Sequence, residues 1–296
     1  MINLSFRHLI QIMLPPKMRN KVDQLVFKPL YKRMITFFEA HPEIAATYKM
    51  EIQYLINQKK IAFFPYPFIE QYEMSNVRVE KDTGNGMNYV IHLGKRLYFP
   101  RNMNKNNVKK MYCELCMEQD DNSPHRYFTN SFDVTRDDIF VDVGSAEGMI
   151  ALETIERSKG TVLFEVDPFW IEALEATFRP WNEKVVIVNK MVSSYVGEDT
   201  TTLDQYFENA EDPIVLKIDV EGCENNVLKG AQKTLSYQET RVVCCTYHRT
   251  EDSSVLKTIL EDHGYKTEFS SGYMLWYHDL KIEPPYFRRG LIRAWH

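Results

Sequence analysis

The chain has 296 residues, of which 44% are apolar and 26% charged, and its net charge at pH 7 is −5. This length allows one large α/β domain with an appendage or two small domains, and the composition is that of an ordinary globular protein. The acidic balance disfavours a nucleic-acid partner, because nucleic acids normally require a basic protein face.

The N-terminal residues, Met1 to Leu14, mix apolar positions with Arg7 and His8. They lack the long apolar centre and the cleavage site of a secretion signal, and no stretch of the sequence is apolar enough to span a bilayer. We expect an amphipathic segment that docks on the protein's own body. Peripheral contact with a membrane surface is the alternative, supported by the basic residues between Lys17 and Arg33.

The five cysteines show no spacing typical of a disulfide framework. Cys244 and Cys245 lie in an apolar run and should point to opposite faces of a strand. Cys113 and Cys116 form a C-x-x-C pair, but no second pair stands at a distance suited to zinc, so we expect them on one face of a helix. Reduced, packed thiols of this kind are typical of a cytoplasmic protein.

Residues 1–130 are predicted to form an N-terminal extension of helices and a β-hairpin. Apolar residues recur at three- and four-residue spacings through residues 31–38 and 48–56, which indicates helices that end before Pro65 and Pro67. Alternation of apolar and polar residues from Val77 to Arg101, around turns at 82–86 and 94–95, predicts the hairpin. Residues 105–118 are expected to form a short helix.

Residues 131–283 are predicted to form an α/β domain, followed by a C-terminal tail at 284–296. Short apolar runs alternate with amphipathic helical segments, which indicates a mostly parallel sheet covered on both faces. The expected strands are 139–143, 161–165, 185–188, 214–220 and 241–247, with helices after Pro168, at 203–207 and at 255–263. Residues 265–269 and 273–277 are predicted to complete the sheet as an antiparallel hairpin. This layout is similar to that of Rossmann-like class I methyltransferases.

The first strand of this domain ends in the turn Gly144-Ser145-Ala146-Glu147-Gly148, preceded by Asp142. In such sheets a ligand binds where the strand turns into its helix, and glycine lets the backbone approach the ligand closely. The spacing is not the G-x-G-x-x-G of a dinucleotide site. Two acids, Asp142 and Glu147, would repel a pyrophosphate but suit the ammonium and sulfonium of S-adenosylmethionine. The electrostatics therefore favour S-adenosylmethionine over NAD.

Glu165 directly follows the second strand, about 20 residues beyond the first glycine, where an acid is expected to hold a ribose diol. An acid that merely caps the next helix is the alternative interpretation of Glu165. On the fourth strand, Lys217, Asp219 and Glu221 should share one face, since side chains alternate along a strand. Charges that emerge from a buried strand must be paired or face a cavity.

The sequence from Lys217 to Ala231, K-I-D-V-E-G-C-E-N-N-V-L-K-G-A, strongly resembles the FkbM-type methyltransferase family. The motifs D-V-G-S-A-E-G and F-E-V-D-P support this resemblance, which covers roughly residues 123–278. The resemblance implies use of S-adenosylmethionine and methylation of hydroxyls, mostly on sugars and natural products. It places the cofactor's amino-acid part among Asp142, Gly144, Ser145, Ala146, Glu147 and Gly148, the ribose on Glu165, and Asp219 and Glu221 at the pocket floor.

His248, at the end of the fifth strand, is the first candidate for a general base, because the unperturbed pKa of histidine lies near 6.5. Asp219 is the second candidate; alternatively it orients the acceptor hydroxyl or binds a divalent cation together with Glu221. Many members of the family have a Glu two residues before this His, where the present chain has Thr246. If that Glu orients the His in relatives, its role is vacant here or taken by another residue.

Upstream, His125, Arg126 and Tyr127 resemble a segment found before the cofactor turn in one branch of the family, and they are expected to contact the substrate. A surface turn that leads into a helix is the alternative. The N-terminal extension is expected to act as a lid or in acceptor recognition, because the core fold leaves one side of its pocket open.

Taken together, the motifs predict an S-adenosylmethionine-dependent methyltransferase that methylates a hydroxyl of a sugar, polysaccharide or natural product. An NAD-dependent oxidoreductase on a related sheet and a catalytically inactive methyltransferase-like scaffold are the alternatives.

Overall fold

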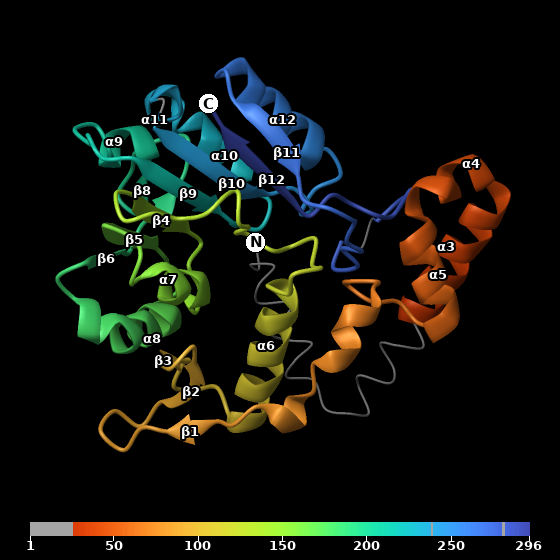
Figure 1. Cartoon of the computed structure of the whole chain (residues 1–296), viewed down its shortest axis with the longest axis horizontal. Helices are drawn as coiled ribbons and strands as arrows, with labels where there is room; N and C mark the ends of the chain where they lie inside the picture. The colour runs from red at the N-terminus through yellow and green to blue at the C-terminus, as the bar shows by residue number, and fades with distance from the viewer. Residues whose placement is uncertain (1–25, 238, 280–281) are drawn as a thin grey trace.

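A computed structural model describes residues 26–237, 239–279 and 282–296 of the chain. Figure 1 shows a sheet with helices packed around it and a group of helices, α3 to α5, set apart from it. Among the described residues, no helix has the length and apolar character needed to cross a membrane. The amphipathic segment expected at Met1 to Leu14 lies outside the described residues, as does most of the basic stretch that begins at Lys17.

The central sheet has seven strands in the order β6-β5-β4-β9-β10-β12-β11. They are β4 (Ile139–Val143), β5 (Gly160–Phe164), β6 (Val185–Val188), β9 (Ile214–Ile218), β10 (Thr240–Cys245), β11 (Lys266–Phe269) and β12 (Leu291–Trp295). Neighbours from β6 to β10 pair in parallel, whereas β12 runs antiparallel to both β10 and β11. The predicted Rossmann-like α/β fold, mostly parallel and ending in an antiparallel pair, is confirmed.

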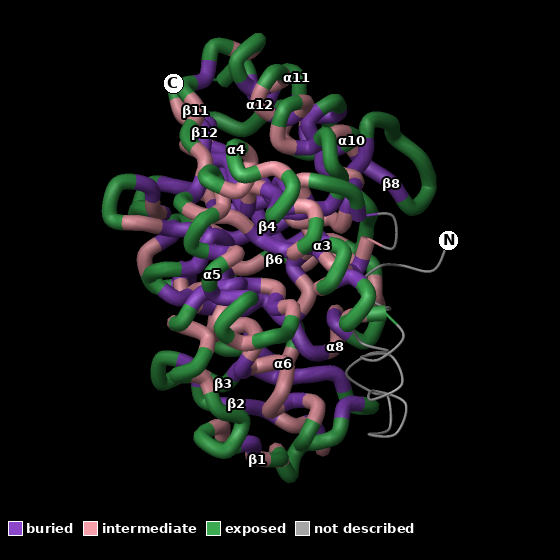
Figure 2. The backbone as a smooth tube through the Cα atoms, turned by 90° about the vertical axis from the view of Figure 1, so that its right-hand side faces the viewer, coloured by how far each residue is buried: buried purple, intermediate pink, exposed green. Residues whose placement is uncertain are grey.

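Each face of the sheet has its own apolar core, because side chains alternate along the strands. Cys245 belongs to the core on one face and Cys244 to the core on the other, as expected for adjacent residues of a strand. The first core includes residues of α6 (Lys105–Glu118), α7 (Met149–Thr154) and α8 (Pro168–Phe178). The second includes residues of α9 (Leu203–Tyr206), α10 (Glu224–Lys229), α11 (Gln232–Ser236) and α12 (Asp252–Asp262). Figure 2 shows the buried segments around β4 at the centre of the molecule.

The second strand of the terminal hairpin is not at 273–277, as the sequence predicted, but at Leu291–Trp295, which was expected to lie in a tail. Residues 291–295 pair with β10 on one side and β11 on the other, and four of the five are buried. Tyr273, Leu275 and Tyr277 instead pack with the N-terminal helices. The turn residues Ser270-Ser271-Gly272 therefore begin a long connection rather than a tight hairpin.

The N-terminal extension forms the helices and the hairpin that the sequence predicted. Its helices are α3 (Lys28–Ala40), α4 (Pro42–Ala45) and α5 (Lys49–Gln58). The hairpin region is a three-stranded antiparallel sheet of β1 (Glu80–Lys81), β2 (Asn88–His92) and β3 (Lys95–Tyr98). Leu30, Met34 and Leu55 of the helices pack against Leu275 and Phe287 of the connection between β11 and β12. The N-terminal helices are therefore attached to the core through this connection. Single 3₁₀ turns at 46–48, 67–71, 74–76 and 179–181 and a short pair, β7 (Met191–Val192) with β8 (Thr200–Thr201), complete the structure.

All five cysteines lie in the described part of the chain, and each is free. Cys113 is buried on α6 and Cys116 is half-buried three residues later on the same helix. The pair lies on one helix, as expected from its three-residue spacing.

Candidate active site

Two glycines, Gly144 and Gly148, allow the turn after β4 to pack closely against its neighbours. Gly144 has φ +82°, and a Cβ on it would lie 2.0 Å from the main-chain oxygen of Asp219. Gly148 has φ +73°, and a Cβ there would lie 2.6 Å from a methyl group of Leu174 on α8. A side chain at either position would push the turn away from β9 or from α8. The two glycines therefore hold the turn against the carboxyl ends of the strands, where ligands bind in this kind of sheet.

A buried ion pair lies beneath this turn. Asp142 of β4 and Lys217 of β9 are opposite each other in the register of the two strands. Lys217 Nζ lies 2.6 Å from Asp142 Oδ1 and donates a further hydrogen bond to the carbonyl of Gly144 at 3.2 Å. Burial raises the pKa of Asp142, although Lys217 partly counteracts this effect. Of the charges predicted at the end of the fourth strand, Lys217 is thus paired with Asp142 of the neighbouring strand.

The second oxygen of the Asp142 carboxylate has no hydrogen-bond partner, although the residue is only 1% exposed. Asp142 and Lys217 line a small cavity of about 120 Å³ together with Glu147 and residues of α6. Burial raises the pKa of Glu147 to about 7. An unpaired acceptor, an ammonium group and a second carboxyl therefore surround one small polar space, which suits a ligand that carries both an ammonium and a carboxylate.

Glu165 is tied to the turn rather than to the helix that follows it. Its carboxylate accepts hydrogen bonds from the backbone N–H groups of Ala146, at 2.8 Å, and Asp167, at 2.8 Å. The helix cap is Asp167, which accepts a hydrogen bond from the N–H of Phe169 at 2.9 Å. Helix capping is therefore performed by Asp167, and Glu165 stands beside the turn, where the sequence predicted a ribose ligand.

A second group of polar side chains centres on Asp219, just after β9. Tyr127 donates a hydrogen bond to Asp219 Oδ2 at 2.7 Å, and His248 Nε2 lies 3.6 Å from Asp219 Oδ1. The other ring nitrogen of His248 lies 2.8 Å from Oε1 of Glu224, which is wholly buried. Asp219, His248 and Glu224 thus form a chain of alternating charge at the ends of β9 and β10 and the start of α10.

The pKa values of this chain differ from the values expected for isolated side chains. Burial alone would lower the pKa of His248, but Glu224, Asp219 and Glu221 raise it to about 9. Burial would likewise raise the pKa of Asp219, yet the neighbouring His248 and Lys217 lower it to about 2. The pKa of His248 therefore lies above the unperturbed value of histidine, which is near 6.5. At neutral pH His248 is a cation held between two carboxylates.

Glu224 of α10 places a carboxylate beside His248. Thr246 stands at the position of the Glu found in many family members, but its hydroxyl donates a hydrogen bond to the carbonyl of Arg289 at 3.0 Å and does not contact His248. Because Glu224 belongs to the motif shared with the family, it is not a substitute for that Glu, and the position before His248 carries no acid in this chain.

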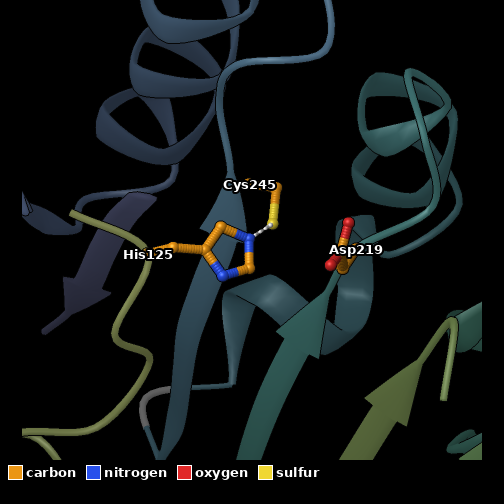
Figure 3. A group of neighbouring side chains, drawn as sticks. All are labelled: His125, Asp219 and Cys245. Atoms are coloured by element: carbon orange, nitrogen blue, oxygen red, sulfur yellow. Dashed lines mark hydrogen bonds between the residues drawn. The ribbon is translucent and has the colours of Figure 1, made fainter. Parts of the chain in front are cut away.

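His125 and Tyr127 reach this cluster, but Arg126 does not. His125 Nε2 lies 3.0 Å from the hydroxyl of Tyr247 and 3.6 Å from Sγ of Cys245. Figure 3 shows His125 on the loop before β4, with Cys245 on β10 and Asp219 after β9. Arg126 donates hydrogen bonds to the carbonyls of Gln119 and Phe128, and it lines a separate groove. The expected substrate contact of Arg126 is thus replaced by a structural role, since neighbouring residues of a loop face opposite ways.

Two sets of side chains in the described part of the chain lie close enough to share a cation. They are His125 with Asp219 and Cys245, and Asp219 with Glu224 and His248, and the donor atoms of each set lie within 4.8 Å of one another. Hydrogen bonds and ion pairs within the protein already engage these side chains, and burial raises the pKa of the Cys245 thiol well above its usual value, which keeps it protonated. We therefore interpret both sets as parts of one network of hydrogen bonds and ion pairs.

A larger cavity of about 400 Å³ adjoins the small one, and Asp219, Ala146 and Glu118 line both. One wall is aromatic: Trp276 packs against Tyr247 with ring centroids 4.9 Å apart and against Phe63 at 5.3 Å. The edge of Trp276 also meets the ring of His248, 5.0 Å away. The remaining walls come from residues 60–69, α6 and α8. The site is therefore a polar floor beneath a pocket that has aromatic side chains on one side.

A model of the family described as "Methyltransferase FkbM domain" matches residues 31–267. The chain belongs to the FkbM methyltransferase family. The match begins well before the region that resembles the family in its motifs, so most of the N-terminal extension of this FkbM methyltransferase is part of the family domain. Methyltransferases in general take their methyl group from S-adenosylmethionine.

Several of the solved structures that are similar to this chain are described as methyltransferases. An FkbM methyltransferase from Methylobacillus flagellatus KT is 15% identical, with a TM-score of 0.45 over 64% of this chain and 54% of that one. The present chain thus spans about half the length of that protein. A precorrin-6y C5,15-methyltransferase from Geobacter metallireducens GS-15 is 14% identical, with a TM-score of 0.38 over 55% of this chain and 81% of that one. A putative RNA methyltransferase from Pyrococcus horikoshii is 12% identical, with a TM-score of 0.34 over 53% and 71%. A comparison with curated proteins gave no significant match.

The sequence left three residues of this FkbM methyltransferase site without a role. Glu224 stands in the motif that carries the family resemblance, so its contact with His248 could have been proposed from that motif. Lys217 was expected to be paired, but its partner, Asp142, depended on strand order. Trp276 gave no signal, because a long connection of irregular structure carries it to the pocket.

Proposed function

We propose that this protein transfers the methyl group of S-adenosylmethionine to a hydroxyl of a sugar, a polysaccharide or a natural product. The observation that carries the proposal is the position of Asp219. Its carboxylate lines the small cavity beside the Gly144 turn and the larger aromatic cavity, and it lies next to His248. A methyl group that leaves the small cavity and a hydroxyl in the larger one would meet at this residue. We also propose that the protein is located in the cytoplasm, because its cysteines are reduced thiols.

The residues of the small cavity fit the amino-acid part of the cofactor. The free oxygen of Asp142 could accept a hydrogen bond from an ammonium group, and Lys217 could donate one to a carboxylate. Gly144 lets the turn pack against the main chain of Asp219, where a Cβ would collide with its carbonyl oxygen. Glu165, beside the turn, would exchange a backbone partner for a ribose diol. Glu147, Ser145 and Gly148 complete the turn, and Glu221 lies with Asp219 on the floor of the larger cavity.

The cofactor, when bound, supplies a methyl group on a positively charged sulfur. The hydroxyl oxygen of the acceptor would bond to that carbon as the carbon–sulfur bond broke with its electron pair remaining on sulfur, and the hydroxyl proton would have to leave. His248 would accept this proton at Nε2, the nitrogen that faces Asp219. Because the pKa of His248 is about 9, the residue must first lose its own proton. Asp219 would orient the hydroxyl as a hydrogen-bond acceptor.

The walls of the larger cavity support an acceptor with a ring. Phe63, Tyr247 and Trp276 present aromatic surface on which the apolar face of a sugar can pack. Glu114 and Glu118 of α6 add carboxyl groups that can accept hydrogen bonds from further hydroxyls. Because α6 and residues 60–69 form these walls, we assign acceptor recognition to the N-terminal extension.

Two measurements test this function. Calorimetric titration should show binding of S-adenosylmethionine and none of NAD; binding of NAD alone would favour an oxidoreductase, and binding of neither would favour an inactive scaffold. Mass spectrometry after incubation with S-adenosylmethionine and a panel of sugars should then show a methylated hydroxyl. Replacing His248 by Ala should abolish the product while leaving the affinity for S-adenosylmethionine nearly intact. Methylation on nitrogen or carbon alone would reject the hydroxyl assignment.

A further inference from the structure

Glu224 is held in one position by contacts from three directions. Its Oε1 accepts hydrogen bonds from the backbone N–H of Val220, at 3.1 Å, and of Gly222, at 3.2 Å. The same oxygen lies 2.8 Å from Nδ1 of His248, an ion-pair contact that lacks the angle of a hydrogen bond. The side chain is 0% exposed. A carboxylate this deeply buried needs a cation beside it, and the histidine is the cation within reach.

The two backbone contacts come from the turn that follows Asp219. In that turn Glu221 has φ +54° and Gly222 has φ +92°, both in the left-handed region. Glu224 satisfies the N–H groups on either side of Glu221 and so stabilises this conformation. One carboxylate thus fixes the backbone next to Asp219 and the ring of His248 together.

We infer that Glu224 is a positioning residue for the proposed base: it fixes the His248 ring with a proton on Nδ1 and leaves Nε2 facing Asp219 as the proton acceptor. This inference rests on the proposed function for its catalytic meaning, but the orientation of the ring does not depend on the identity of the acceptor. The arrangement follows the general pattern in which a carboxylate orients an imidazole through one nitrogen while the other works on the substrate.

Several charged or titratable groups besides Glu224 surround His248. They are Asp219 and Glu221 after β9, Asp252 at the start of α12, His125 on the loop before β4, and Arg288, whose guanidinium donates a hydrogen bond to the carbonyl of His248 at 2.9 Å. Two carboxylates form ion pairs with the ring: that of Glu224 at 2.8 Å and that of Asp219 at 3.6 Å. Loss of Glu224 should therefore change the proton affinity of His248 more than loss of any other single carboxylate.

The experiment is an NMR titration of the His248 ring in the full chain without ligand, with the signal assigned by its loss in His248→Gln. In the unchanged protein, the ring should titrate near pH 9, and above that pH the nitrogen shifts should show the proton on Nδ1. In Glu224→Gln the midpoint should fall by about 1–3 pH units, the usual effect of losing an adjacent opposite charge. Glu224→Asp, which keeps the charge but withdraws it, should give an intermediate midpoint.

The matched control is Asp204→Asn. Asp204 Oδ1 also accepts hydrogen bonds from two backbone N–H groups, those of Lys233 at 2.9 Å and Thr234 at 2.8 Å, but Asp204 has no contact with His248. This variant should leave the His248 midpoint unchanged. An unmoved midpoint in Glu224→Gln, an equal fall in Asp204→Asn, or a proton on Nε2 in the unchanged protein would overturn the inference.

The outcome separates this inference from the proposed function. If methyl transfer takes place but the His248 midpoint does not respond to Glu224, the positioning role is rejected and the function stands. If the midpoint falls as expected but no hydroxyl is methylated, the proposed function is rejected. If Glu224→Gln does not fold, the nitrogen that carries the proton in the unchanged protein, together with the midpoint of Glu224→Asp, decides the question.

Discussion

Replacing Lys217 by Met should destabilise the protein strongly, because it leaves the carboxylate of Asp142 buried without a cation. The two side chains are 6% and 1% exposed, and their charged atoms are 2.6 Å apart. Removing one partner of such a pair typically costs about 3–5 kcal/mol. For a protein of this size, that loss corresponds to a fall in melting temperature of the order of 10 °C.

The loss should depend on pH in a defined direction. Burial raises the pKa of Asp142 above its unfolded value, and without Lys217 the pKa should rise further. A carboxyl with a raised pKa in the folded state favours folding while it is protonated and opposes folding as pH rises above its unfolded value, about 3.9. Lys217→Met should therefore lose more stability at pH 8 than at pH 5.5, as measured by urea denaturation.

A surface ion pair provides the control. Lys159 Nζ also lies 2.6 Å from a carboxylate, that of Asp212, but these side chains are 54% and 41% exposed. Lys159→Met should cost at most about 1 kcal/mol. The double variant Lys217→Met with Asp142→Asn should recover part of the stability, since no charge remains buried. A loss below about 1 kcal/mol for Lys217→Met, or a double variant no more stable than the single one, would refute the importance of this buried pair.

Three other results are expected. Gly144→Ala should weaken S-adenosylmethionine binding by at least about tenfold in calorimetry. The added Cβ would lie 2.0 Å from the Asp219 carbonyl oxygen, and the left-handed conformation costs an L-residue roughly 1–2 kcal/mol. An unchanged affinity would show that the turn does not hold the cofactor. The value of kcat/KM should rise about tenfold per pH unit from neutral pH and level off near pH 9, because only the neutral form of His248 can accept a proton. A flat profile over this range would exclude His248 as the base. Methyl transfer should persist after exhaustive chelation, because the side chains around Asp219 that could share a cation already contact other groups of the protein. Loss of activity that returns with added Mg²⁺ would show that Asp219 and Glu221 bind a metal.

Local patterns predicted the elements whose formation depends on neighbouring residues. The strand Ile139–Val143 and the helix Lys105–Glu118 have the predicted bounds, because periodicity and turn residues act within a few positions. The strand Leu291–Trp295 was missed, because its place between β10 and β11 is decided by pairing across the sheet. Arg293, at the centre of this strand, interrupts its apolar pattern. The side chain donates hydrogen bonds to the carbonyls of Arg126 and Tyr127, which are distant in sequence, so this role could not be predicted from local pattern.

The candidate site divides in the same way. Asp142 near the end of β4, and Glu165 and Asp219 directly after β5 and β9, could be proposed from recognisable motifs, because parallel strands bring such ends to one edge. The protonation of His248 could not be predicted from the sequence, because it depends on a carboxylate from another element at 2.8 Å. The aromatic wall likewise required Trp276 to be carried to the pocket by a connection without a regular pattern.

The position of β12 has a consequence for the order in which the protein can be built. Leu291–Trp295 follows both β10 and β11 in the sequence, yet it separates them within the sheet. Arg293 of this strand donates hydrogen bonds to the carbonyls of Arg126, at 2.5 Å, and Tyr127, at 3.0 Å, on the loop that carries His125. Until synthesis reaches this strand, β10 and β11 expose unpaired edges and the loop lacks its anchor. A nascent chain therefore cannot acquire a competent catalytic centre before residues 291–295 have been synthesised, and termination ahead of them should yield an aggregating product rather than a weakened enzyme.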